Sequence, residues 1–119
     1  MNKLYLWTRC STCRIARQLL FEAGINFEER DWFADPLKGE ELDQLAERVG
    51  GVQALVAVQS PSFRKLGRQL ETISAQELRE LVLAEPRLLR RPLLITHDGM
   101  EMSGIKAIRD YVRHRARQA

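Results

Sequence analysis

The spacing of apolar residues changes early in the chain, at the point where its two cysteines occur. Residues 3–7 (KLYLW) combine apolar and aromatic side chains and predict a short buried strand. From Ser11 or Thr12 onward a helix is predicted, because apolar residues recur on one helical face: Ile15, Ala16, Leu19, Leu20 and Ala23. Gly24 is placed to end this helix, and the alternation in residues 25–31 (INFEERD) predicts a second strand.

The middle of the chain has mainly helical spacing. After Pro36 a helix is predicted by Leu42, Leu45, Ala46 and Val49, with Gly50 and Gly51 at its end. Residues 52–58 (VQALVAV) fit either a helical turn or a strand, and we favour the turn. Residues 60–67 (SPSFRKLG) predict a loop with a short turn. Ser74 and Glu77 fit a capping box that begins a helix running to about Ala84.

The last part of the chain predicts two short strands and a helix. Residues 93–96 (LLIT) predict a third strand, and the turn 97–99 (HDG) leads to a partner strand at 100–102. A final helix is expected from Ser103 to about His114. The order of elements predicts an α/β protein with a thioredoxin-like fold and a helical insertion. We expect a single domain over residues 1–119, with the insertion at about 36–90.

Composition narrows the class of protein. The chain has 119 residues, of which 45% are hydrophobic and 29% charged, as in ordinary soluble domains. No stretch approaches the roughly 18 apolar residues of a membrane span, and the start is too short for a signal peptide, so we expect a cytoplasmic protein. The net charge of +3 is spread over scattered basic residues and no helix-turn-helix is legible, so direct specific DNA binding is not expected.

The pair Cys10 and Cys13 carries the most specific chemistry. It opens the first predicted helix, where unpaired N–H groups and the helix dipole favour a thiolate, and Arg9 and Arg14 add positive charge. Cys10 is the outer residue and is predicted to attack. Cys13, one turn further into the helix, is predicted to resolve a mixed disulfide or a sulfenic acid.

Two other interpretations of the pair stay open. Structural zinc needs about four ligands, whereas here one pair of cysteines stands with two isolated histidines, His97 and His114, so no metal is expected. Small free cysteines also fill strand–helix junctions as inert core residues. Trp7 and Trp32 are interpreted as packing residues.

Several segments together resemble the arsenate reductase (ArsC)-like family, and within it the Spx/MgsR branch. The markers are LY…C..CR.A…L from Leu4, RD.F..PL…EL from Arg30, FRKLG at 63–67 and EP.LLRRPLL at 85–94. The resemblance implies a thioredoxin-like fold with a helical subdomain and a cis bond between Arg91 and Pro92. It also implies that Cys10 is the nucleophile, while Arg14 and Arg91 bind the anion.

The resemblance to true arsenate reductases is incomplete. Those enzymes use two further arginines around the oxyanion, and an ungapped alignment places Ala57 and Gly104 there. Arg91 alone would bind so highly charged an oxyanion weakly, so arsenate reduction is not predicted. Arg64 is a candidate substitute for one of the two missing arginines. We expect no bound cofactor, with a small thiol or a redox protein as partner. Glutathione or a thioredoxin-type protein would supply the electrons.

The Spx branch implies a second function. Spx-like regulators carry a Cys-x-x-Cys switch and bind the C-terminal domain of the RNA polymerase α subunit, and Gly51 aligns with a glycine of that contact. Gln59 stands where Spx has an arginine that supports the oxidised state. Three hypotheses therefore remain: a thiol–disulfide oxidoreductase, a redox-sensing regulator, and a relative with neither activity. The sequence leaves open whether the chain is an enzyme.

Overall fold

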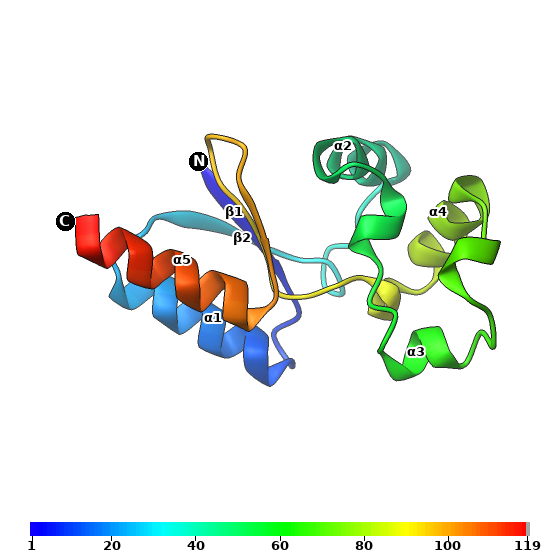
Figure 1. Ribbon diagram of the computed structural model, residues 1–119, viewed down its shortest axis with the longest axis horizontal. Helices are drawn as coiled ribbons and strands as arrows, with labels where there is room; N and C mark the ends of the chain where they lie inside the picture. The colour runs from blue at the N-terminus through cyan, green and yellow to red at the C-terminus, as the bar shows by residue number, and fades with distance from the viewer. Residues whose placement is uncertain (119) are drawn as a thin grey trace. The chain divides into compact units, whose positions relative to one another are not determined.

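The chain divides into two compact units (Figure 1). The computed structural model describes residues 1–118, and the side chains of residues 1–115. The first unit contains Met1–Asp35 and the segment that begins at Arg91, and the second is Pro36–Arg90. In chain order the helices and strands are β1 (Asn2–Leu6), α1 (Ser11–Glu22), β2 (Phe27–Asp31), α2 (Gly39–Val49), α3 (Pro61–Arg64), α4 (Ala75–Ala84), β3 (Leu93–Ile95), β4 (Glu101–Ser103) and α5 (Ile105–Gln118).

The four strands of the first unit form one mixed sheet in the order β2-β1-β3-β4. β1 runs parallel to β2, with Leu6 opposite Asp31, and antiparallel to β3, with Tyr5 opposite Leu93. β4 is antiparallel to β3. The carboxyl ends of β1 and β2 and the start of β3 therefore meet at one edge of the sheet, and the predicted α/β class is confirmed.

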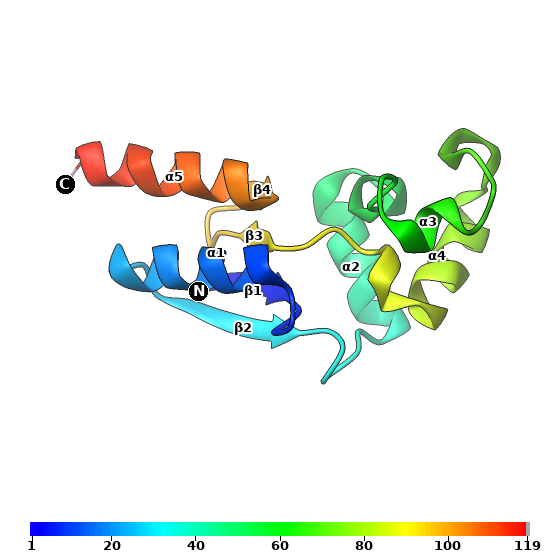
Figure 2. The ribbon, with the colours of Figure 1, turned by 90° about the horizontal axis from the view of Figure 1, so that it is seen from below.

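One face of this sheet forms the core of the first unit. Alternate residues of β1, Leu4 and Leu6, are fully buried together with Cys13, Ala16 and Leu20 of α1. α1 and α5 contact each other on this face, and α5 contributes Ile108 (Figure 2). The two helices thus cover the sheet and fix the position of the loop that precedes α1.

The buried face of α1 differs from the predicted one. Ile15 is 44% exposed and Ala23 lies beyond the helix end, whereas Cys13 is fully buried. Residues 13, 16 and 20 are three and four positions apart and share one face, which turns Ile15 outward. Cys13 was not among the residues predicted for the buried helical face, although a core role for the cysteines was one of the open interpretations, and its burial fits that role.

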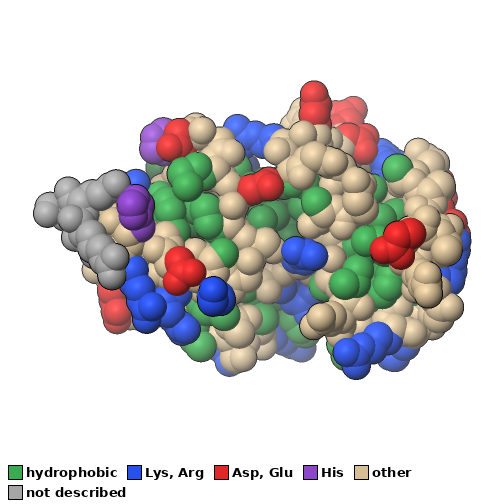
Figure 3. Space-filling view, viewed as in Figure 1, with side chains coloured by type: hydrophobic (Ala, Val, Ile, Leu, Met, Phe, Trp, Pro, Cys, Tyr) green, Lys and Arg blue, Asp and Glu red, His purple; other side chains and the backbone are tan. Residues whose placement is uncertain are grey.

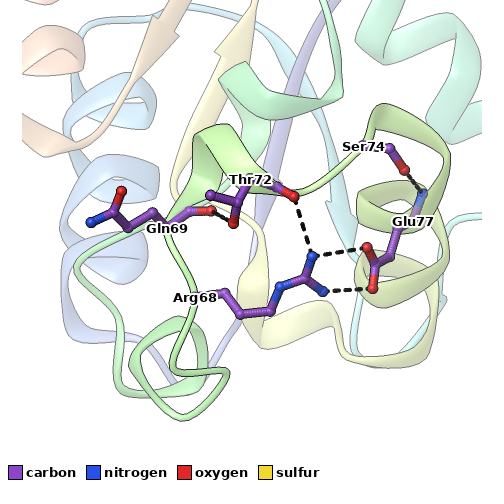
Figure 4. A network of polar contacts seen from close by, with 5 residues as sticks. All are labelled: Arg68, Gln69, Thr72, Ser74 and Glu77. Atoms are coloured by element: carbon purple, nitrogen blue, oxygen red, sulfur yellow. Dashed lines mark hydrogen bonds and ion pairs between the residues drawn. The ribbon is translucent and has the colours of Figure 1, made fainter.

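The second unit contains helices and short 3₁₀ turns. Half of the capping box predicted for Ser74 and Glu77 is present, because the Ser74 hydroxyl oxygen accepts the Glu77 N–H at 3.1 Å. The Glu77 carboxylate binds Arg68 and not the Ser74 N–H. The Arg68 guanidinium contacts both carboxylate oxygens of Glu77, at 2.6 and 3.1 Å, and also the carbonyl oxygen of Thr72 (Figure 4). This network ties the segment before α4 to the first turn of α4.

Two segments of the second unit depart from a simple loop or helix. Residues 60–67, predicted as a loop, contain the short helix α3, which Ser60 caps by accepting the Phe63 N–H at 3.2 Å. Within 52–58 the favoured helical turn is present as the 3₁₀ turn Val52–Leu55. The residue that follows, Val56, pairs with Leu89 as an isolated bridge. The favoured helical turn is therefore confirmed over Val52–Leu55, and no strand forms in this stretch.

The last helix begins later than predicted. Ser103 lies in β4 opposite Leu93, and α5 begins at Ile105. Gly104 stands between them with φ of 92°, a left-handed conformation that favours glycine. None of the helices within residues 1–118 has the length and apolar composition needed to cross a membrane.

Candidate functional site

Cys10 lies at the N-cap of α1, in the loop that leaves the sheet edge described above. Its backbone N–H donates to the Trp7 carbonyl oxygen at 2.9 Å, and its own carbonyl oxygen accepts the Arg14 N–H at 3.1 Å. The thiol therefore lies at the N-terminus of α1, beside the N–H groups of the first helical turn.

The surroundings of Cys10 favour its thiolate. Its sulfur lies 3.2 Å from the Thr12 hydroxyl oxygen, and the side chain is half-buried. Burial raises the pKa of Cys10, but hydrogen bonds from the Thr12 hydroxyl and from the Cys13 thiol and N–H, together with the Arg91 charge, outweigh burial. The net pKa is below the ordinary value for cysteine, as reactive thiols require.

Cys13 has the opposite character. It is fully buried in the core of the first unit, and burial raises its pKa to about 12, despite the hydrogen bond to the Trp7 backbone. The neighbouring Cys10 raises it further through a hydrogen bond and through charge. Both cysteines are free thiols. One thiol is therefore accessible and prone to ionise, while the other keeps its proton.

Arg91 comes to this site from the start of β3. The bond between Arg91 and Pro92 is cis, the isomer that the resemblance implies. The guanidinium carbon of Arg91 lies 5.3 Å from the centroid of the Trp7 ring and 5.6 Å from that of Phe33. Its charge lowers the pKa of both Cys10 and Cys13.

The other predicted site residues are placed differently. The Arg14 side chain is exposed, and its Nη1 donates to the Thr8 carbonyl oxygen at 3.2 Å. Arg64 is exposed at the end of α3, in the second unit, and its role in anion binding stays a prediction. Gly51 follows α2 in that same unit, with φ of 132°.

Sequence reasoning missed three contributors to the site. Trp7 was interpreted as packing only, yet with Phe33 it contacts Arg91, and the two rings lie 4.5 Å apart between centroids. Asp31 at the end of β2 accepts the N–H groups of Thr8, Phe33 and Ala34. The available signal was the position of these residues at the ends of two predicted strands, since parallel strands end at one sheet edge.

Other kinds of site find little support in the described part of the chain. Among its residues, no three His, Cys, Asp or Glu side chains are grouped as ligands for a metal ion. On the face drawn in Figure 3, Lys and Arg side chains alternate with Asp and Glu and do not merge into one basic surface. The chemistry of the described residues is thus concentrated around Cys10.

Residues 5–104 match the family model described as "ArsC family". Among curated proteins, the chain is 38% identical over 103 residues to "Global transcriptional regulator Spx" of Enterococcus faecalis, covering 86% of this chain and 78% of that protein. It is 34% identical over 103 residues to the protein of the same name from Bacillus subtilis, covering 86% and 79% of the two chains.

Solved structures of similar fold agree with the match to the ArsC family model. An arsenate reductase (ArsC) related protein from Brucella melitensis has a TM-score of 0.71 and 32% identity, covering 87% of this chain and 85% of that one. A putative arsenate reductase from Yersinia pestis has a TM-score of 0.78 at 19% identity, covering 95% and 99%, and shows the fold alone. The predicted thioredoxin-like fold is confirmed.

Proposed function

Since the chain belongs to the ArsC family, we propose that it is a thiol–disulfide redox protein in which Cys10 attacks and Cys13 resolves. The contrast between the two thiols carries this proposal: Cys10 is half-buried with a lowered pKa, and Cys13 is buried with its pKa raised to about 12. A nucleophile must ionise and be reached, whereas a resolving thiol must wait until the first step is complete.

The reaction consists of two exchanges. The Cys10 thiolate attacks one sulfur of a small or protein disulfide, forms a mixed disulfide and releases the other sulfur as a thiolate. Cys13 then transfers its proton to a released thiolate and attacks the Cys10 sulfur, which forms the Cys10–Cys13 disulfide and frees the second thiol. Two molecules of glutathione, or one thioredoxin-type dithiol, then supply two electrons and return both cysteines to the reduced state.

The structure also supports this order of events. Burial is the main cause of the high pKa of Cys13, but the Cys10 thiolate adds to it through charge and a hydrogen bond. Once Cys10 is part of a mixed disulfide, that negative charge is gone. The Cys13 proton is then easier to remove, so attack by Cys13 follows attack by Cys10.

Thiol trapping across a series of glutathione redox poises, read by mass spectrometry, tests the proposal. We expect a reversible disulfide between Cys10 and Cys13 within the cytosolic range of potentials. The Cys13→Ser variant should instead accumulate a glutathione adduct on Cys10, while the matched Cys10→Ser variant should accumulate none. A chain that forms no intramolecular disulfide at any poise would contradict the proposal.

The Spx-named relatives favour a second candidate, a regulator whose disulfide state controls binding to the C-terminal domain of the RNA polymerase α subunit. The resemblance assigns Gly51 to that contact, and Gly51 follows Gly50, the residue that ends α2, with φ of 132°. The test is capture of the purified α domain by the reduced and the oxidised chain. Capture that is equal in both states, or absent, excludes this candidate.

A matched pair of glycines separates contact from folding in that assay. Gly51→Arg should abolish capture, whereas Gly67→Arg should not, although Gly67 also has positive φ, at 63°, in the same unit. Thermal unfolding of both variants shows whether each is folded. Equal loss of capture in the two variants would remove Gly51 from the contact.

A further inference from the structure

Three segments that are distant in sequence place an aromatic and cationic cluster next to the Cys10 loop. Trp7 directly follows β1, Phe33 follows β2, and Arg91 precedes β3. Because β1 is parallel to β2 and antiparallel to β3, these three positions meet at one edge of the sheet. Cys10 lies in the loop that continues from Trp7, and its N–H donates to the Trp7 carbonyl oxygen.

The two rings and the Arg91 guanidinium lie close together. The two ring centroids are 4.5 Å apart, and the Arg91 guanidinium carbon is 5.3 Å from one and 5.6 Å from the other. These three distances are similar, so the guanidinium lies beside both rings and not between them. Each ring lies within the roughly 6 Å at which its face attracts a cation.

We propose that Trp7 and Phe33 are positioning residues that hold the Arg91 guanidinium against two ring faces and so keep its charge directed at Cys10. The inference rests on the proposed function of Cys10 as the attacking thiol. Arginine has a long and flexible side chain, and a guanidinium released into water would sample many positions. Two ring contacts restrict it to a few of them.

The charge of Arg91 reaches the thiol in this arrangement. After burial, which raises it, the pKa of Cys10 is lowered by hydrogen bonds and by the Arg91 charge. A Coulomb interaction weakens as the charges separate and as water enters between them. Loss of either ring should therefore reduce the Arg91 effect on Cys10 without removing the arginine.

The backbone around the rings is fixed independently of Arg91. Asp31 accepts the Phe33 N–H at 2.9 Å and the Thr8 N–H, next to Trp7, at 3.2 Å. One carboxylate thus connects both ring-bearing segments. A change of the Trp7 or Phe33 side chain leaves these backbone hydrogen bonds in place, which makes such variants suitable tests.

The test is the rate of Cys10 alkylation by iodoacetamide as a function of pH, with the modified residue identified by mass spectrometry. We expect Trp7→Leu and Phe33→Leu each to slow alkylation at pH 7 by roughly two- to fivefold, the population change that an exposed cation–π contact produces. Their profiles should shift to higher pH. Trp7→Phe keeps a ring face and should keep the wild-type rate, and Tyr5→Leu, in which the lost ring stacks on Trp32, should do the same.

An Arg91→Met background distinguishes positioning from packing. There the Trp7→Leu change should have no further effect, because no guanidinium remains to be positioned. The proposal would be overturned if Trp7→Leu slowed alkylation equally in both backgrounds. It would also be overturned if Trp7→Leu and Phe33→Leu both reacted like wild type while Arg91→Met reacted slowly. In those two cases Cys10 is still a reactive thiol and the proposed function stands. If Cys10 of the wild-type chain instead showed the pH profile of an ordinary cysteine, both this proposal and the proposed function would be overturned.

Discussion

The carboxylate of Asp31 offers the sharpest test of how this site is built. It accepts three backbone N–H groups, from Phe33 at 2.9 Å and from Thr8 and Ala34 at 3.2 Å each. Burial raises its pKa, but the hydrogen bonds from Phe33, Thr8 and Ala34 lower it more, so the charged form is favoured in the folded protein. Removal of this carboxylate should loosen both segments that flank the Cys10 loop.

The loss of folding stability on removal of the Asp31 carboxylate can be bounded from the geometry of its hydrogen bonds. A part-buried hydrogen bond to a charged acceptor contributes about 1.5 kcal/mol, and two longer exposed ones contribute about 0.5 kcal/mol each. Asp31→Ala should therefore lower the free energy of unfolding by about 2–3 kcal/mol. Asp31→Asn, which keeps one acceptor oxygen but loses the charge, should cost about 1–1.5 kcal/mol. Asp110→Ala is the control, since its 3.8 Å contact with Lys106 is a surface pair worth less than about 0.5 kcal/mol.

Urea denaturation at several pH values measures these differences. A carboxylate whose pKa is lowered by folding stabilises the protein above its unfolded pKa of about 3.9, and this stabilisation is lost as pH falls through the lower folded value. The gap between wild type and Asp31→Asn should be constant from about pH 7 to pH 5 and should narrow below about pH 4. A gap that is absent at pH 7, or that stays constant to about pH 2.5, would refute the reasoning.

Three further outcomes are expected. Iodoacetamide at pH 7–9 should modify Cys10 alone, because the pKa of Cys13 is about 12, and a peptide map that shows equal modification of Cys13 would contradict this. Leu94→Ala should cost about 2–5 kcal/mol in urea denaturation, because Leu94 is fully buried against α1 and α5, and a loss below about 1 kcal/mol would be inconsistent with that packing. Ser74→Ala should cost about 0.5–2 kcal/mol through loss of the α4 cap, whereas Ser74→Asp should retain it, and equal losses in the two variants would count against the cap.

Local features of the fold were predictable because they depend on near neighbours in the chain. The strand before the cysteines, the helix that Cys10 opens and the Ser74 cap all follow from residue spacing within a few positions. The order of accessibility of Cys10 and Cys13 was also predictable, because one residue lies outside the helix and the other one turn within it. The sequence by itself thus determined which of the two thiols is outer and which is inner, because position along the helix sets that order.

Contacts between distant segments were decided only by the tertiary structure. Helical spacing alone placed Ile15 on the buried face of α1, and the sheet that covers the helix selected Cys13, Ala16 and Leu20 instead. Residue spacing predicted that Ser103 begins the last helix, but Ser103 is the end of β4 and pairs with Leu93 of β3, which satisfies its backbone.

The same reason applies to the site. Arg91 was assigned to it by resemblance alone, and nothing local predicted that its guanidinium would rest on Trp7 and Phe33. Strand pairing brings those three residues and the Asp31 carboxylate to one sheet edge from positions far apart in the chain. The cysteine pair is a property of the sequence, whereas the charge and hydrogen bonds that make its two thiols unequal depend on the folded sheet.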